Sequence, residues 1–96
     1  MTITGIISRV GQPREFTTTQ NGLEKKQKAI EIQLKSGASE ILAELYGEGV
    51  DVLAANARVG QLACADVVFN VKEADRRDGS GKMAYMRATI ACVNLV

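Results

Sequence analysis

The sequence predicts an all-β domain: a five-stranded Greek-key barrel with a short helix between the third and fourth strands. Three observations predict this fold. Two strand-like segments precede a third that ends in an aromatic-glycine pair, Tyr46-Gly47, and a segment of helical length follows. Arg58-Val59-Gly60 then leads into two long apolar runs, which a polar segment with two glycines, residues 75–82, separates. We expect a single domain, residues 1–96, because a chain of this length buries one modest core.

The first strand spans Ile3 to Val10, where apolar residues alternate loosely with polar ones. Gly5 lies within it, and a glycine inside a strand often marks a bulge or a tight bend. Gln12-Pro13 ends the strand, and a polar loop then finishes in Asn21-Gly22, a dipeptide typical of hairpin turns.

The second strand begins near Glu24 and alternates with a period of two residues. Its core face carries Ile30, Ile32 and Leu34. Ser36-Gly37 then turns the chain.

The remaining elements follow from apolar periodicity. The third strand spans Glu40 to Tyr46, and its alternation leaves Tyr46 on the face opposite the core. Val50 to Ala57 has a helical apolar stripe and is expected to close the bottom of the barrel. Gln61 to Lys72 is rich in small and β-branched residues, which predicts a fourth strand buried on both sides for part of its length. Met83 to Val96 is the fifth strand.

Composition argues against an enzyme or a metalloprotein. The chain has no histidine, and its only two cysteines are 28 residues apart, so the commonest general base and the spacing of a zinc site are both missing. We expect Cys64 and Cys92 to be buried thiols in a reducing compartment, with a disulfide as the alternative. There is no leader-like N-terminus and no bilayer-length apolar run. These features predict a cytoplasmic protein without cofactor, metal or membrane partner.

The net charge of +1 conceals a segregation of charge along the chain. Residues 1–35 hold six basic and three acidic residues, residues 36–70 hold one and five, and residues 71–96 hold five and three. The two basic ends supply the connection between the first and second strands and the connection between the fourth and fifth. The acidic middle is expected to lie away from the surface that these connections flank. Ordinary solvated charges would give the same pattern.

Several short motifs extend in order over nearly the whole chain. They are Val10-Gly11-Gln12-Pro13 with Phe16, Asn21-Gly22, Leu45-Tyr46-Gly47, Arg58-Val59-Gly60, and Asp78-Gly79-Ser80-Gly81 with Tyr85. Their order and spacing resemble the bacterial single-stranded DNA-binding protein superfamily, whose members have the five-stranded OB-fold Greek-key barrel. The chain also resembles small OB-fold proteins of unassigned role in Bacteroidetes.

The resemblance implies binding of single-stranded DNA, or of RNA, by base stacking and phosphate contacts without sequence specificity, as in DNA replication. Tyr46 stands where the family places a base-stacking aromatic residue, and Phe16 and Tyr85 are further candidates. The residues expected to contact phosphates are Lys25, Lys26, Lys28, Arg76, Arg77, Lys82 and Arg87. The nucleic acid is expected to follow the second and third strands and the loops centred on residues 14–26 and 75–82.

Each aromatic residue also has a purely structural interpretation. Tyr46 packed against the helix, with its hydroxyl in water, fits the sequence equally well. Phe16 would anchor the first long loop, and Tyr85 would pack on the first strand. Phe69 belongs to the apolar run of the fourth strand and is expected in the core.

Two positions depart from the resemblance. By register, related proteins carry tryptophans where this chain has Glu40 and Ala74, and only 4% of the chain is aromatic. Stacking contributes about 1–3 kcal/mol per base, so binding is expected to be weak, salt-sensitive and mostly electrostatic.

A second hypothesis is a protein-interaction or assembly module with little affinity for nucleic acid. Low aromatic content and near-neutral charge favour it, whereas the basic loops and Tyr46 favour nucleic-acid binding. Related proteins form dimers or tetramers, which implies a homo-oligomer. Ile6 and Val10, at apolar outer positions of the first strand, are the residues expected at that interface.

Overall fold

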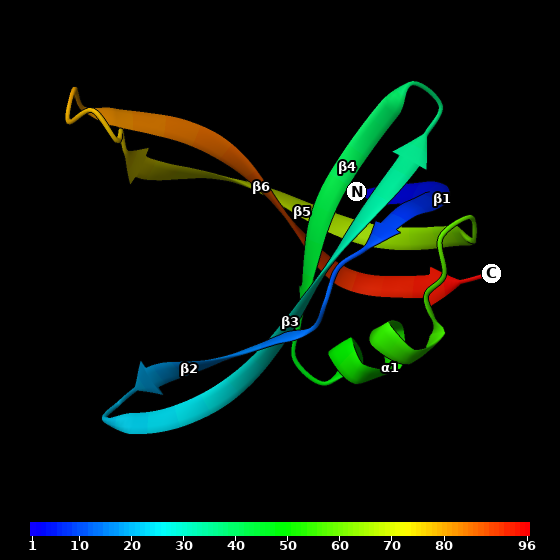
Figure 1. Ribbon diagram of the computed structural model, residues 1–96, viewed down its shortest axis with the longest axis horizontal. Coiled ribbons are helices and arrows are strands. Elements are labelled where there is room, and N and C mark those ends of the chain that lie inside the picture. The colour runs from blue at the N-terminus through cyan, green and yellow to red at the C-terminus, as the bar shows by residue number, and fades with distance from the viewer.

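Two hairpin arms project from a closed β-barrel in the computed structural model, which describes residues 1–96 (Figure 1). The elements are β1 (Thr2–Val10), β2 (Arg14–Gln20), β3 (Leu23–Ser36), β4 (Ser39–Tyr46), α1 (Gly49–Asn56), β5 (Leu62–Asp75) and β6 (Lys82–Leu95). The Cα radius of gyration is 15.1 Å. A compact domain of this length has a radius of gyration of about 12.5 Å, and the arms account for the excess.

The barrel is closed by the two pairings of β1. Strand order is β1-β5-β6-β4-β3-β2, and β1 pairs with β3 as well as with β5. All pairs are antiparallel except β4 and β6, which are parallel and meet at Ala43–Ala88 and Glu44–Thr89. The predicted five-stranded barrel is confirmed, with β1, β3, β4, β5 and β6 as its strands and α1 between the third and fourth of them.

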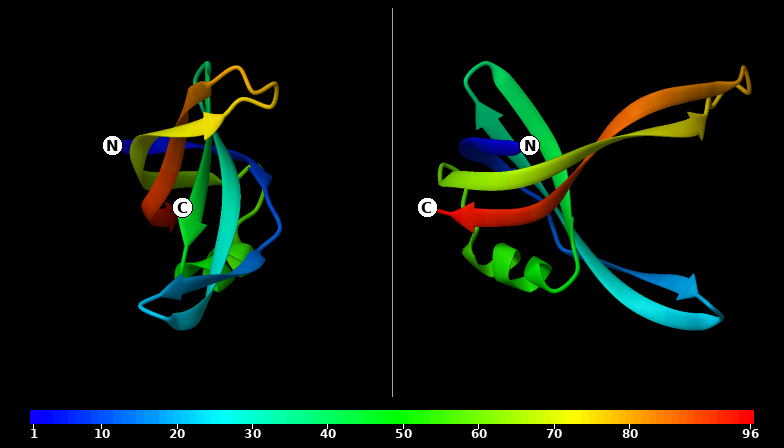
Figure 2. Two further views of the ribbon diagram at one scale, coloured as in Figure 1. Left: turned by 90° about the vertical axis from the view of Figure 1, so that its left-hand side faces the viewer. Right: turned by 180° about the vertical axis from the view of Figure 1, so that it is seen from behind.

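The arms arise because three strands are longer than the barrel needs. β3, β5 and β6 each have 14 residues. At 3.3 Å per residue such a strand is about 45 Å long, and only part of it lines the core. The remainder forms the β2–β3 arm (residues 14–28) and the β5–β6 arm (residues 70–87). Figure 2 shows both arms diverging from the same side of the barrel.

β2 is an addition to the expected strands. The sequence predicted a polar loop before the second barrel strand, yet Arg14 to Gln20 pairs antiparallel with β3. Consecutive threonines favour this, since β-branched residues suit a pleated strand. The predicted hairpin signal is confirmed: Asn21 and Gly22 both have positive φ, 53° and 77°, as a two-residue type I′ turn requires.

The core fills the barrel and is covered at one end by the helix. Ile30, Ile32 and Leu34 are at most 1% exposed, which confirms the predicted core face of the second barrel strand. α1 begins one residue before the predicted position and ends one residue before the predicted end. Its Val50 and Leu53 are buried in the same cluster.

β1 corrects two sequence expectations. Gly5 is required by a close approach rather than a bulge, because a Cβ there would lie 2.7 Å from the carbonyl oxygen of Lys35. The register shift lies instead between Ile7 and Arg9. It turns Val10 toward the core, so the expected outward position is wrong for Val10. Ile6 does point outward and is 42% exposed.

β5 is buried on one side only, contrary to the prediction. Ala63, Ala65 and Val67 are buried, while the residues between them are exposed or half-buried. The run is nearly continuous in the sequence because the exposed face of β5 also carries apolar residues, such as Leu62 and Val68, which are 41% and 49% exposed. The two cysteines are free thiols, and Cys92 is exposed, so its predicted burial is wrong.

Candidate nucleic-acid interface

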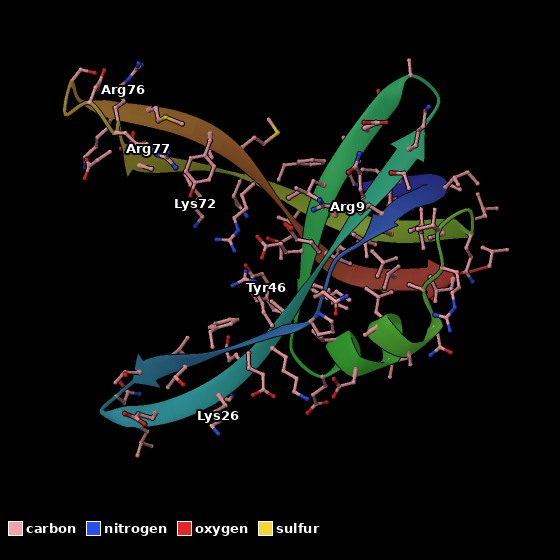
Figure 3. The ribbon with its side chains drawn as sticks, viewed as in Figure 1. Arg9, Lys26, Tyr46, Lys72, Arg76 and Arg77 are labelled. Carbon is pink, nitrogen blue, oxygen red and sulfur yellow. The ribbon has the colours of Figure 1, made fainter.

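A cleft of about 400 Å³ lies where the two arms leave the barrel. It is lined by Arg14, Phe16, Gln27 and Tyr46 on one side and by Asn70, Lys72, Arg87 and Thr89 on the other. Figure 3 shows Tyr46 and Lys72 in the space between the arms. The cleft therefore combines two aromatic rings with three cationic side chains.

Strand register explains why these residues share one surface. Directly paired residues of antiparallel strands point to the same face. Phe16 pairs with Gln27 in the β2–β3 arm, and Asn70 pairs with Arg87 in the β5–β6 arm. The alternation predicted for β4 puts Tyr46 opposite the core, and the structure confirms that orientation.

The two aromatic rings contact each other at the floor of the cleft. Phe16 and Tyr46 pack edge to face, with centroids 6.0 Å apart and planes at 89°. Each ring is also covered by an arginine: the guanidinium of Arg14 lies 5.5 Å from the Phe16 centroid, and that of Arg87 lies 5.5 Å from the Tyr46 centroid. Such cation–π contacts orient both guanidiniums in the cleft.

Glu44 connects these groups. Its carboxylate accepts hydrogen bonds from Arg14 Nη2 at 2.6 Å, from Arg87 Nη2 at 3.2 Å and from the Tyr46 hydroxyl at 3.0 Å. The Glu44 side chain is only 18% exposed. The expectation that the acidic middle of the chain lies away from the basic surface is therefore wrong for this residue. The Tyr46 hydroxyl is likewise not free in water.

The three lysines of the β2–β3 arm lie on different faces. Lys25 lies two residues from Gln27 on β3 and therefore shares the face that lines the cleft. Lys26 lies on the side of the arm that faces away from the cleft (Figure 3). Lys28 is on that far side too, where its Nζ pairs with Asp51 at 2.9 Å and with Glu15 at 3.9 Å. The hydrogen bond and charge of Asp51 raise the pKa of Lys28 above its usual value.

The predicted phosphate contacts of the other arm divide between its base and its tip. Arg87 lies in the cleft. Arg76 and Arg77 are at the tip of the arm (Figure 3), as is Lys82, the first residue of β6. None of these three tip residues forms an ion pair. Asp78 accepts hydrogen bonds from the Ser80 hydroxyl and amide at 2.6 and 3.0 Å. These bonds lower the pKa of Asp78 and order the turn.

Tyr85 is not packed on β1 as its structural interpretation required. It pairs with Lys72 in the β5–β6 arm and therefore shares the face of that cleft residue. Tyr85 is 41% exposed and lines an adjoining hollow together with Leu42, Glu44 and Arg87. Phe69 packs against the core, as predicted.

Several cleft residues were not singled out from the sequence. They are Arg14, Gln27, Asn70, Lys72 and Thr89, and the same is true of Glu44, the ion-pair partner of the cleft arginines. Strand alternation could have predicted two of them. Asn70 and Lys72 lie on the same face of β5 as Ala74, where related proteins carry a tryptophan. Glu44 shares the face of Tyr46, but nothing local in the sequence brings an arginine to it.

Two further features were sought in the structure: a cluster of metal-binding side chains and a membrane-spanning helix. No group of three histidine, cysteine, aspartate or glutamate side chains is placed to hold a metal ion. No helix has the length and apolarity needed to cross a membrane.

Comparison with solved structures identifies the fold. The chain is similar to two crystal structures of the mitochondrial single-stranded DNA-binding protein of S. cerevisiae, with TM-scores of 0.61 and 0.55 and identities of 18% and 21%. Each comparison covers 100% of this chain and 92% of the other. The chain is an OB fold. No protein-family model and no curated protein sequence matches this OB domain.

Proposed function

We propose that this OB domain binds single-stranded DNA in the cleft between its two arms, without sequence specificity and without catalysis. OB folds bind oligonucleotides on the face of the second and third barrel strands, between the loops that here form the two arms. The observation that carries the proposal is the cleft on that face, in which Phe16 and Tyr46 lie among Arg14, Lys72 and Arg87. The fold shared with a single-stranded DNA-binding protein also supports it.

The chemistry of the cleft suits an unpaired strand. Aromatic rings stack on any exposed base, which a duplex does not offer, and guanidinium and ammonium groups track the phosphates. With only two rings, the base contribution is small. We infer weak and strongly salt-dependent binding, in which tip residues such as Arg76 and Arg77 extend the phosphate path beyond the cleft.

Fluorescence anisotropy with labelled oligo-dT and a matched duplex, each at low and high salt, tests this function. We expect a preference for the single strand that declines as salt rises. Lys72→Ser removes a cleft cation and should reduce the slope of log K against log salt by about 0.7. Lys26→Ser removes the same charge from the far side of the β2–β3 arm and is the matched control. Equal binding of duplex and single strand, or equal effects of the two variants, would contradict the proposal.

The assembly hypothesis has one specific observation in its favour. Ile6 and Leu62 are directly paired on the outer face of β1 and β5 and are 42% and 41% exposed. We propose that this apolar pair lies in a homo-oligomer interface. Light scattering during gel filtration should give a multiple of 10.3 kDa that falls in an Ile6→Lys variant. A monomer at every concentration rules the interface out.

A further inference from the structure

Glu44 is a carboxylate in the middle of a surface that we propose binds a polyanion. It lies on β4 and contacts residues of both arms: Arg14 at the base of β2 and Arg87 in β6. The two guanidiniums in the cleft are therefore already occupied by an anion that belongs to the protein. Only Lys72, among the cleft cations, forms no ion pair.

We propose that Glu44 is an internal competitor for strand phosphates, which must replace its carboxylate at Arg14 and Arg87 before the nucleic acid is fully bound. This inference rests on the proposed single-strand binding. A phosphate presents anionic oxygens to a guanidinium much as a carboxylate does, so the two anions compete for the same donors. In this exchange, the guanidiniums of Arg14 and Arg87 donate to phosphate oxygens instead of to Glu44, so the number of charged hydrogen bonds stays the same. The Glu44 carboxylate is released to water.

The same exchange links phosphate contact to base stacking. Arg87 lies over the Tyr46 ring and Arg14 over the Phe16 ring, so the guanidiniums held by Glu44 also cover the faces that a base would use. The Tyr46 hydroxyl is tied to the same carboxylate. When phosphates draw the guanidiniums away from Glu44, both rings are uncovered. Glu44 therefore lowers affinity for isolated anions, which offer phosphate but no base to take the place of the arginine.

Replacing Glu44 by glutamine provides the test, because it keeps the shape of the side chain and removes its charge. We expect Glu44→Gln to bind oligo-dT about fivefold more tightly at low salt, from the gain of one unit of net positive charge near the phosphates. The slope of log K against log salt should become steeper by about 0.7.

Glu15→Gln is the matched control. It removes the same charge from the β2–β3 arm, where Glu15 pairs with Lys28 and not with a cleft residue. We expect its affinity to stay within twofold of the wild type. Equal gains in the two variants, or weaker binding by Glu44→Gln, would overturn the inference, the latter because Glu44 would then be organising the arginines for binding.

The outcomes separate the inference from the proposed function. Binding by the wild type with no gain in Glu44→Gln overturns the inference alone. Binding that appears only in Glu44→Gln refutes single-strand binding by the native protein and, with it, the exchange at Arg14 and Arg87 in the native complex. Absence of binding in both refutes both.

A second readout needs no variant and therefore does not depend on the folding of one. The side-chain carboxyl ¹³C resonance of Glu44 should shift when the wild type is titrated with oligo-dT, together with the Nε–H resonances of Arg14 and Arg87. An unchanged Glu44 resonance at saturation would mean that the ion pairs persist in the complex and would overturn the inference.

Discussion

Tyr46 offers the sharpest test of base stacking, because each part of the side chain has a separate contact. Its ring packs edge to face with Phe16, and its hydroxyl donates to Glu44. Tyr46→Leu keeps apolar bulk at the end of β4 and removes the π-face, whereas Tyr46→Phe keeps the face and removes the hydroxyl. Stacking of one base is worth about 1–3 kcal/mol, so Tyr46→Leu should weaken oligo-dT binding by about 5- to 150-fold.

Salt dependence distinguishes stacking from a disturbance of the charges. A neutral ring releases no counterions, so both Tyr46 variants should keep the wild-type slope of log K against log salt. Tyr46→Phe should bind within about threefold of the wild type, since it loses one hydrogen bond that Glu44 can replace with water. Anisotropy at several salt concentrations measures both quantities, and thermal unfolding checks that each variant is folded. Wild-type affinity in Tyr46→Leu, or a loss as large in Tyr46→Phe, would refute the stacking argument.

Three further predictions concern the scaffold and the arm tip. Gly5→Ala forces a Cβ within 2.7 Å of the Lys35 carbonyl oxygen and should destabilise the protein by about 1–3 kcal/mol in urea unfolding; an unchanged midpoint would contradict the close approach. Ile32→Ala empties a fully buried position and should cost about 2–5 kcal/mol by the same assay, whereas a loss below 1 kcal/mol would place Ile32 outside the core. Hydrogen bonds from Ser80 lower the pKa of Asp78, so Ser80→Ala should raise that pKa in a carboxyl ¹³C titration. The contact stabilises the turn above the ordinary pKa of an aspartate, and this stabilisation is lost as pH falls through the lowered pKa of Asp78. Identical Asp78 titrations in the wild type and Ser80→Ala would contradict a role of the Ser80 hydroxyl.

Local patterns in the sequence were sufficient to predict the barrel. Alternation identified the buried face of β3 and the outward position of Tyr46, and apolar spacing located α1 to within one residue at each end. These features depend on residues close together in the chain. Glycine and asparagine marked the tight turn at residues 21 and 22 because few other residues adopt its positive φ.

The binding surface depends instead on contacts between distant segments. Arg87 and Glu44 are 43 residues apart and meet only because β4 and β6 pair in parallel. The sequence analysis treated the acidic middle segment as a whole, so it did not single out Glu44, the carboxylate that pairs with the cleft arginines. A register shift in β1, which no sequence pattern announced, likewise turned Val10 inward.

Backbone NMR of ¹⁵N-labelled protein titrated with oligo-dT tests most directly whether the cleft is the binding site. Each chain has a mass of only 10.3 kDa, which suits the assignment of its backbone amides. The proposed function predicts that shifts concentrate on both walls of the cleft, at Gln27 and Tyr46 on one side and at Asn70, Lys72 and Arg87 on the other, while α1 and the outer face of β1 stay unchanged. Shifts confined to α1 or β1, or to one arm alone, would contradict a strand bound between the arms.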